Sequence, residues 1–242
     1  MCTVTYVPVK GKFFITSNRD EKSVRNKAVL PQVYNYGEYK LIFPKDANAG
    51  GTWIAAHENG NIIVLLNGGF VKHNYEPPYR KSRGIILLDI INNDKPVNAF
   101  NTIDLERIEP FTIIIASYKK LHECRWDGKQ KHTKEIDYKV PHIWSSVTLY
   151  DSNIIAKREG WFKEWINNNK HFAMHNIVQF HLFTGDGDTN NDLKMNRNND
   201  MLTVSITSVE VTNTKATMYY KDLQDNIEHT QELSFQPDFV LS

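Results

Sequence analysis

The sequence has little cysteine, no excess of charge of one sign and no long apolar run, and each absence excludes a class of protein. Two cysteines in 242 residues, Cys2 and Cys124, cannot build the disulfide framework of a small secreted domain. With 29 basic and 28 acidic residues, the chain lacks the basic excess that is typical of nucleic-acid binders. The same balance gives no reason to expect adhesion to anionic membranes. We therefore expect a partner that is neither a nucleic acid nor a membrane.

Segments that would divide or anchor the chain are also missing. The N-terminus carries no basic stretch before an apolar one, so it does not resemble a secretory signal. The longest apolar run, Ile62–Leu66, is far shorter than the ~20 residues that span a bilayer. No linker rich in Gly, Ser or Pro interrupts the chain, and no repeat stands out. We expect residues 1–242 to form one domain of a cytoplasmic protein.

The hydrophobic patterns predict strands, then helices, then strands. The strands expected first, with a hairpin turn at Asn59-Gly60, are Thr3–Val9, Phe13–Ser17, Tyr39–Phe43, Thr52–His57 and Asn61–Leu66. The middle predicts helices over Arg80–Asn92, Pro96–Thr102, Asp151–Asn167 and Lys170–Phe183, with one strand over Phe111–Ser117. A three-strand meander over Leu202–Val211, Lys215–Tyr220 and Ile227–Phe235 closes the chain. This order indicates an α+β fold of antiparallel sheets covered by helices.

Cys2 follows the initiator Met directly, and removal of that Met would make Cys2 the first residue. A free α-amine has a pKa of about 7.7–8.0 and is well placed to act as a general base at neutral pH. A terminal thiol can then be activated by its own amine, without a separate histidine. The alternative is a cysteine of no function at a frayed chain end.

A charged segment, Ser17-Asn18-Arg19-Asp20-Glu21, follows the second expected strand. A hairpin returning from residue 13 would bring this segment back near residue 2. Arg19 could then hold a thiolate or a substrate carboxylate with its planar donor fork. Asp20 could accept a proton from the terminal ammonium or orient Arg19. The alternative is a charged strand end that makes ordinary surface ion pairs.

Taken together, the motifs resemble those of the NRDE-motif family, whose best-known eukaryotic member is transport and Golgi organisation protein 2. Met-Cys and a strand precede the Asn-Arg-Asp-Glu segment. Further matches follow in the same order and extend over essentially the whole chain: Gly50-Gly51-Thr52-Trp53, Asn67-Gly68 after an apolar strand, and Ser82-Arg83-Gly84 before a helix. Each motif is weak alone, but their order is specific.

That family is similar to N-terminal nucleophile hydrolases such as penicillin V acylases and bile salt hydrolases. The resemblance implies a four-layer αββα sandwich of two antiparallel sheets. It also implies Cys2 as nucleophile, Arg19 as the adjacent cation and Asp20 as the acid that orients the amine. Asn67 would supply an oxyanion-hole donor, although without the resemblance it reads as a turn residue. Asn18, Glu21, Thr52, Trp53 and Ser146 complete the expected site as substrate-binding residues, with Glu21 a possible substitute for Asp20.

One departure from the family bears on the mechanism. Family members commonly carry Ser-Asn near the middle of the chain, where this sequence has Trp144-Ser145-Ser146. The hydroxyl of Ser146 can donate a hydrogen bond, but it reaches less far than an amide.

No other feature predicts a metal or cofactor site. His171 and His175 would share one helix face, but a third ligand is lacking. The acidic loop Asp186–Asn190 lacks the glycine and glutamate of a calcium loop. We expect no metal and no cofactor, and we regard Cys124 as incidental.

Two functions remain open at this point. The first is a cysteine amidohydrolase that acts on the C–N bond of a small non-peptide amide. The second is a non-catalytic binding or trafficking protein with the same fold, involved in lipid or haem homeostasis. A free amine on Cys2 separates the two, because the hydrolase needs it and a carrier of lipid or haem-like ligands does not.

Overall fold

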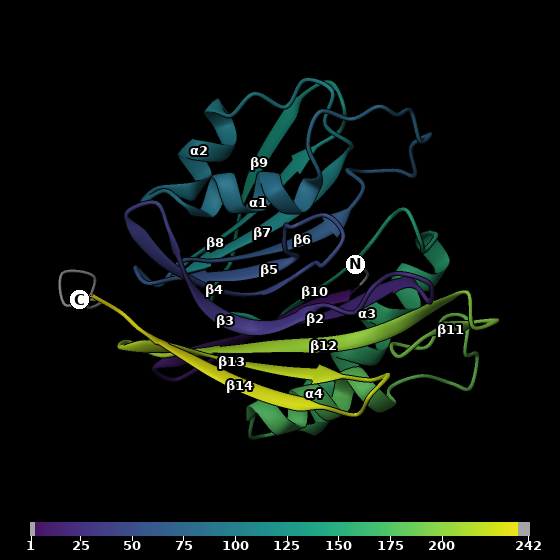
Figure 1. Cartoon of the computed structure of the whole chain (residues 1–242). Helices are drawn as coiled ribbons and strands as arrows, with labels where there is room; N and C mark the ends of the chain where they lie inside the picture. The colour runs from purple at the N-terminus through teal and green to yellow at the C-terminus, as the bar shows by residue number, and fades with distance from the viewer. Residues whose placement is uncertain (1–2, 237–242) are drawn as a thin grey trace.

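Residues 3–236, which the computed structural model describes, form two antiparallel β-sheets stacked between two pairs of helices (Figure 1). The first sheet has the strand order β10-β1-β2-β12-β13-β14, with β11 paired to β12. Its strands are β1 (Thr3–Val9), β2 (Lys12–Lys22), β10 (His142–Ser145), β11 (Asn196–Arg197), β12 (Met201–Val211), β13 (Lys215–Asp222) and β14 (Glu228–Ser234).

The second sheet runs in sequence order from β3 to β9. Its strands are β3 (Val29–Tyr36), β4 (Tyr39–Lys45), β5 (Ile54–His57), β6 (Ile62–Asn67), β7 (Phe111–Ser117), β8 (Lys120–Trp126) and β9 (Lys131–Ile136). Helices α1 (Arg83–Ile91) and α2 (Pro96–Thr102) cover its outer face, and α3 (Ser152–Asn168) and α4 (Met174–Phe183) cover the outer face of the first sheet (Figure 1). The four-layer αββα arrangement expected from the sequence is confirmed.

Strand β6 shows why the layers stack in this order. Successive side chains of a strand point to opposite faces of the sheet. Ile62, Val64 and Leu66 therefore pack in the core between the sheets, whereas Ile63 and Leu65 pack against α1 and α2. The continuous apolar run predicted a strand covered on both faces, and this prediction is confirmed.

The outer face of the first sheet is covered more sparsely. Phe162 of α3 and Phe180 of α4 pack on Val7 and Phe14.

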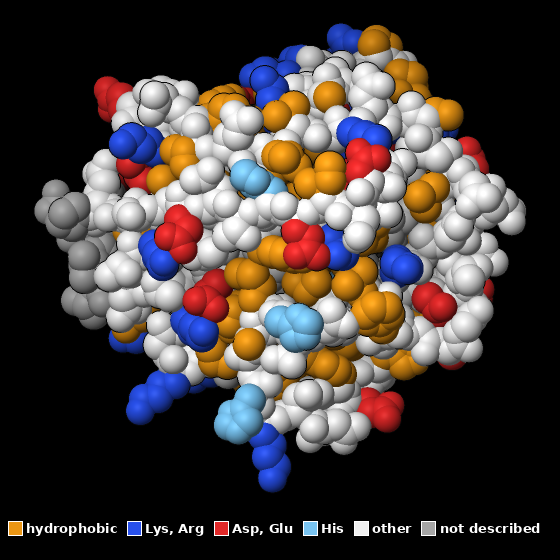
Figure 2. Space-filling model, turned by 60° about the horizontal axis from the view of Figure 1, so that its bottom comes forward, with side chains coloured by type: hydrophobic (Ala, Val, Ile, Leu, Met, Phe, Trp, Pro, Cys, Tyr) orange, Lys and Arg blue, Asp and Glu red, His pale blue; other side chains and the backbone are white. Residues whose placement is uncertain are grey.

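Figure 2 shows the side of the molecule that carries α4: hydrophobic side chains gather near its middle, with positive and negative side chains scattered around them. Neither sign of charge dominates this face. No helix within residues 3–236 is long and apolar enough to cross a membrane.

Several element boundaries differ from the expectation. Strand β2 does not end at Ser17 but continues to Lys22, so the Asn-Arg-Asp-Glu segment lies inside a strand. Helix α1 begins at Arg83 because the Ser82 side chain caps it by accepting a hydrogen bond from the Ile85 N–H. Helix α4 begins only at Met174. The expectation missed five strands, namely β3, β8, β9, β10 and β11, whereas the C-terminal meander is confirmed.

Two motif glycines permit a close backbone contact beside the cleft between the sheets. A Cβ atom on Gly51 would lie 2.4 Å from the carbonyl carbon of Gly84, and one on Gly84 would lie 2.7 Å from the Thr52 oxygen. The Thr52 N–H donates to the Gly84 carbonyl over 3.3 Å. The start of α1 can therefore approach the segment before β5 only because both positions lack a side chain.

We predict that Gly51→Ala destabilises the fold by roughly 1–3 kcal/mol, because the added methyl group meets backbone that cannot move aside. The matched control is Gly160→Ala in α3, where a Cβ meets nothing within 4 Å. That control should stabilise the protein by about 0.5–1 kcal/mol, because alanine favours helix more than glycine does. Urea denaturation measures both changes, and equal midpoints for wild type and Gly51→Ala would refute the contact.

Candidate functional site

The alternation of β2 sends its charged residues to two different sides. Residues Thr3 and Asn18 are paired across β1 and β2, and Arg19 is paired with Ser205 of β12. Asn18 and Asp20 contact groups on the α3 and α4 side, whereas Arg19 contacts the second sheet. The motif therefore does not form one cluster, and Arg19 alone among these three enters the cleft between the sheets.

Arg19 is held in that cleft by Asp46 and Trp53. Its Nη2 lies 2.7 Å from Asp46 Oδ2, and its guanidinium lies over the Trp53 ring, 4.6 Å from the centroid. The side chain of Arg19 is only 4% exposed. Arg25 forms a bidentate pair with the same carboxylate, with distances of 2.9 Å and 3.0 Å. Two arginines thus share one carboxylate, and Glu21 lies 3.4 Å from Arg25 as a second one.

Asp46 is placed by the turn that it caps. Its Oδ1 accepts hydrogen bonds from the backbone N–H groups of Asn48 and Ala49, at 3.0 Å and 2.8 Å. Burial raises the pKa of the Asp46 carboxyl, but the hydrogen bonds from Arg25 and Ala49 outweigh burial and hold the pKa below its ordinary value. The carboxylate therefore stays charged at neutral pH and orients Arg19, a role that the sequence analysis gave to Asp20 as one option.

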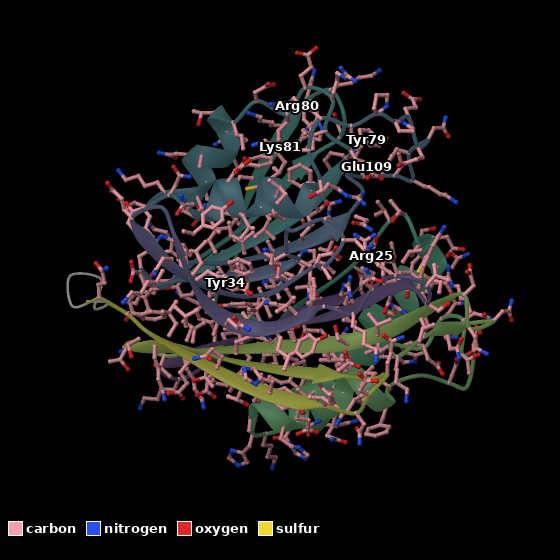
Figure 3. The ribbon with its side chains drawn as sticks, in the orientation of Figure 1. Arg25, Tyr34, Tyr79, Arg80, Lys81 and Glu109 are labelled. Atoms are coloured by element: carbon pink, nitrogen blue, oxygen red, sulfur yellow. The ribbon has the colours of Figure 1, made fainter. Side chains whose placement is uncertain are left out.

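A cavity of about 600 Å³ opens beside Arg19. Of the residues expected at the site, five line it: Arg19, Glu21, Thr52, Trp53 and Asn67. The opposite wall comes from the segment of residues 75–84 and from Glu109. Figure 3 shows Tyr79, Arg80, Lys81 and Glu109 in the upper layer and Arg25 below them. The cavity therefore lies between segments that are far apart in sequence.

The wall formed by residues 80–83 is rich in positive charge. Arg80 and Lys81 are partly exposed and pair with Asp104 and Asp89. Arg83 is more deeply buried and pairs with Glu109 over 3.1 Å. Burial lowers the pKa of Arg83, and Glu109 opposes this shift. The cations of the lining outnumber its carboxylates.

Asn67 lies at the end of β6, where two cavities meet. It lines the large cavity and also a smaller one of about 110 Å³. Its backbone carbonyl accepts a hydrogen bond from Ser146 Oγ over 2.8 Å. No hydrogen bond is recorded for its side-chain amide within residues 3–236. The Asn67 amide is thus available as a donor to a ligand.

The other expected binding residues are engaged within the protein. Ser146 donates to the Asn67 carbonyl, lies 2.9 Å from Thr148 Oγ1 and lines neither of these two cavities. Thr52 Oγ1 lies 2.6 Å from the Pro44 carbonyl oxygen. Glu21 pairs with Arg25 over 3.4 Å. Ser146 therefore supports Asn67 from behind and does not face the large cavity.

Asp20 belongs to a buried network that reaches the start of β1. Its carboxylate accepts hydrogen bonds from Tyr150 Oη at 2.9 Å and Thr203 Oγ1 at 2.5 Å. Arg158 stacks on the Tyr150 ring at 3.6 Å and donates to Thr3 Oγ1 at 2.5 Å. Asp20 is thus linked to Thr3, the first described residue, on the face away from Arg19. Cys2 lies outside the described residues.

Asn18, expected as a substrate-binding residue, lies in the core and lines neither of these two cavities. Its Nδ2 donates to the Leu193 carbonyl over 2.7 Å, and its Oδ1 lies 2.6 Å from His181 Nδ1. The other ring nitrogen of His181 lies 2.8 Å from Thr5 Oγ1. Since Asn18 Oδ1 can only accept, Nδ1 carries the proton and Nε2 accepts from Thr5. Both bonds suit a neutral imidazole.

Four residues of the site were not found from the sequence: Arg25, Asp46, Arg83 and Glu109. A signal existed for Asp46, because aspartate followed by Asn48 and Gly50-Gly51 is typical of a side-chain-capped turn. Arg83 belongs to the motif Ser82-Arg83-Gly84, but nothing in the sequence assigned it a role in the site. Within residues 3–236, His, Cys, Asp and Glu side chains form no group of three or more that could hold a metal ion.

The His181 network predicts how stability depends on pH. Burial and the neighbouring Arg158 lower the pKa of His181 from 6.5 to about 3. In the unfolded chain His181 binds a proton as the pH falls below about 6.5, whereas in the folded chain it stays neutral until much lower pH. The contribution of the neutral His181 network to stability is therefore fully present above pH 6.5. It is lost as the pH falls toward 3.

We predict that the free energy of unfolding declines between pH 7 and pH 4 and that His181→Gln flattens the decline. Burial also lowers the pKa of His57 to about 4, so His57→Gln serves as the second variant and should remove a separate part of the slope. Urea titrations at fixed pH values measure the slope. An unchanged slope in His181→Gln would show that this imidazole does not control the dependence.

Comparisons with known proteins agree with the fold. The family model described as Transport and Golgi organisation 2 matches residues 1–235. No curated protein sequence matches the chain. Among solved structures, the N-acylethanolamine-hydrolyzing acid amidase ortholog of Caenorhabditis elegans has a TM-score of 0.59 at 15% identity, over 86% of this chain and 92% of that one.

A mutant of conjugated bile acid hydrolase from Clostridium perfringens also has a TM-score of 0.59, at 10% identity, over 100% of this chain and 98% of that one. A second variant of that enzyme gives 11% identity over the same shares with a TM-score of 0.59. At these identities the likeness concerns the fold, which is that of the N-terminal nucleophile hydrolases.

Proposed function

Because the chain belongs to the Transport and Golgi organisation 2 family and has the fold of N-terminal nucleophile hydrolases, we propose that it is an N-terminal cysteine amidohydrolase. Its substrate would be a small non-peptide amide, of which the C–N bond is cleaved. The observation that carries the proposal is that Arg19 and Asn67 line one cavity at the end of the sandwich where β1 begins.

The register of β1 supports Cys2 as the nucleophile. Thr3 pairs with Asn18, and antiparallel pairing advances by one residue on each strand in opposite directions. The described part of β1 thus begins opposite the residue that precedes Arg19 on β2. Cys2 comes directly before this part of the strand in the sequence.

The proposed reaction begins when removal of Met1 frees the α-amine of Cys2. The amine takes the thiol proton, and the sulfur attacks the carbonyl carbon of the amide. The C–N bond then breaks, the leaving amine takes the proton from the α-ammonium, and a thioester remains on the sulfur. Water, deprotonated by the α-amine, hydrolyses the thioester, and the thiol recovers its proton. No co-reactant other than water is needed.

The surrounding residues have distinct proposed roles. Arg19 favours the thiolate through its positive charge, and Asp46 and Trp53 fix its position. The unpaired amide of Asn67 donates to the oxyanion, and such a donor contributes about 10²–10³ in rate. Asp20 orients the amine end of the strand through the network that reaches Thr3. Glu21, Thr52 and Trp53 contribute to the substrate-binding wall.

The second candidate is a non-catalytic binding or trafficking protein for a lipid or haem-like ligand. The observation that favours it is the position of Ser146, where family members carry asparagine. Its hydroxyl is directed to the Asn67 carbonyl and does not line the large cavity, so Ser146 does not supply the donor that the family asparagine would supply. Binding in the cavity would remain possible without turnover.

Activity and N-terminal processing test the proposal together. Intact-mass measurement of protein from its natural host should show loss of Met1. The processed protein should release amine from an N-acylethanolamine or a conjugated bile acid, the substrate classes named for the two similar enzymes. Cys2→Ala should abolish release, Asn67→Ala should lower the rate about 10²–10³-fold, and Cys124→Ala should have no effect. Binding of either compound without release by the processed protein would favour the carrier.

Thiol labelling gives an independent prediction. Burial raises the pKa of the Cys124 thiol to about 12, so Cys124 should react slowly with iodoacetamide in the folded protein. Cys2 should react rapidly already at about pH 6–7, below the ordinary thiol value, because Arg19 and the terminal ammonium favour the thiolate.

The same experiment with Arg19→Ala should slow labelling of Cys2, while Lys22→Ala, an exposed position of the same strand, should not. Peptide mapping assigns the labelled cysteine. Equal rates at Cys2 and Cys124, or equal rates at Cys2 in Arg19→Ala and wild type, would remove the case for an activated nucleophile.

A further inference from the structure

A further cavity, of about 450 Å³, opens at the end of the sandwich opposite the candidate active site. Strands β1, β7 and β12 end there, and β2, β8 and β13 begin there. The end of β12 that leads into β13 lies at the left of Figure 1, whereas Arg25, which lines the candidate active site, lies right of centre in Figure 3, which has the same orientation. The cavity shares no lining residue with the one beside Arg19.

The floor of this cavity is apolar and aromatic. Tyr6, Phe13 and Val211 belong to the core between the sheets, and their edges form the bottom of the cavity although each side chain is largely buried. Tyr118 and Tyr138 add two partly exposed rings at the sides. The Tyr6 hydroxyl donates to the Tyr138 carbonyl over 3.0 Å, which ties the two sheets together at this end. The volume is in the ordinary range for a small-molecule site.

The rim of the cavity carries lysine side chains of the turns. Lys119 Nζ lies 4.5 Å from the centroid of the Tyr118 ring, and Lys139 Nζ lies 5.8 Å from that of Tyr138. Together with Lys10, these residues are exposed, and no ion pair is recorded for any of the three within residues 3–236. Lys12, also in the lining, already pairs with Glu210 over 2.9 Å.

No carboxylate lines the cavity among the described residues. The nearest acidic group by sequence, Asp137, accepts a hydrogen bond from the Lys139 backbone N–H through its Oδ1, over 2.9 Å. The cavity therefore combines an apolar floor with a positively charged rim, in which Lys10, Lys119 and Lys139 form no ion pair with another residue of the described range 3–236. A ligand that matches both has an apolar body and one negative end.

We propose that this cavity binds an amphipathic carboxylate, with its hydrocarbon chain against Tyr6, Phe13 and Val211 and its carboxylate among Lys10, Lys119 and Lys139. A cationic amphiphile would meet the three ammonium groups, and a neutral one would leave them unpaired. The inference does not rest on the hydrolase reaction, because the two cavities lie at opposite ends of the strands.

Isothermal titration with decanoate below its micelle concentration tests the site on the full chain. The triple variant Lys10→Ala, Lys119→Ala, Lys139→Ala should weaken binding about tenfold, since each exposed ion pair contributes modestly. The matched control replaces three exposed lysines elsewhere, Lys163, Lys170 and Lys194, and should bind like wild type. Decanol and decyltrimethylammonium should bind at least tenfold more weakly than decanoate.

Two further measurements locate the bound decanoate. Arg80→Ala and Lys81→Ala, at the rim of the first cavity, should leave the affinity unchanged, whereas Tyr118→Ala should reduce it. Equal affinity for decanoate and decanol, or loss of binding in the Arg80→Ala variant, would overturn the proposal. It would equally be overturned if vesicles of anionic phospholipid bound the protein through the three lysines while free decanoate did not bind.

Discussion

The pairing of β2 with β1 on one side and β12 on the other is the constraint on which the candidate site depends. Because β2 remains a regular strand up to Lys22, its side chains alternate between the cleft and the helices. Arg19 is therefore separated from Asn18 and Asp20, although the three are adjacent in sequence. The cleft receives one positive charge, and the opposite face receives hydrogen-bonding groups that secure β1.

The two faces of β2 each adjoin a buried arginine, and the charge of each arginine is compensated in a different way. In the cleft, Arg19 is buried but paired with Asp46, whose carboxylate is in turn held by a capped turn and by Arg25. On the helix side, Arg158 is fully buried, and its recorded partners within residues 3–236 are carbonyl oxygens, the Thr3 hydroxyl and the Tyr150 ring. A buried cation held by dipoles is costly to leave unsatisfied. Movement of β1 would break the bond to Thr3, so Arg158 helps to fix the start of the described part of this strand.

Much of the fold could be predicted because the central strands are covered on both faces. Ile62–Leu66 is apolar throughout and Phe111–Ser117 contains the apolar run Ile113–Ala116, and such runs are recognisable without context. Strand β9, with the sequence Lys-His-Thr-Lys-Glu-Ile, lies at a sheet edge and is mostly solvated, so its sequence resembles a loop. The extension of β2 was missed for the opposite reason. A run of charged residues after an apolar strand is usually taken to mark the end of that strand. Only the partners on other elements show that such residues are buried within it.

The candidate site was predictable where the motif marks a strand end and not where the function depends on pairing across the sheets. Asn67 could be placed because an apolar strand stops at that residue. Asp46 could not be joined to Arg19, because their contact spans 27 positions and two sheets. Local patterns report which face a residue occupies, whereas partners depend on how two sheets are stacked. The turn that carries Asp46 can be recognised from the sequence. The contact of its carboxylate with Arg19 cannot.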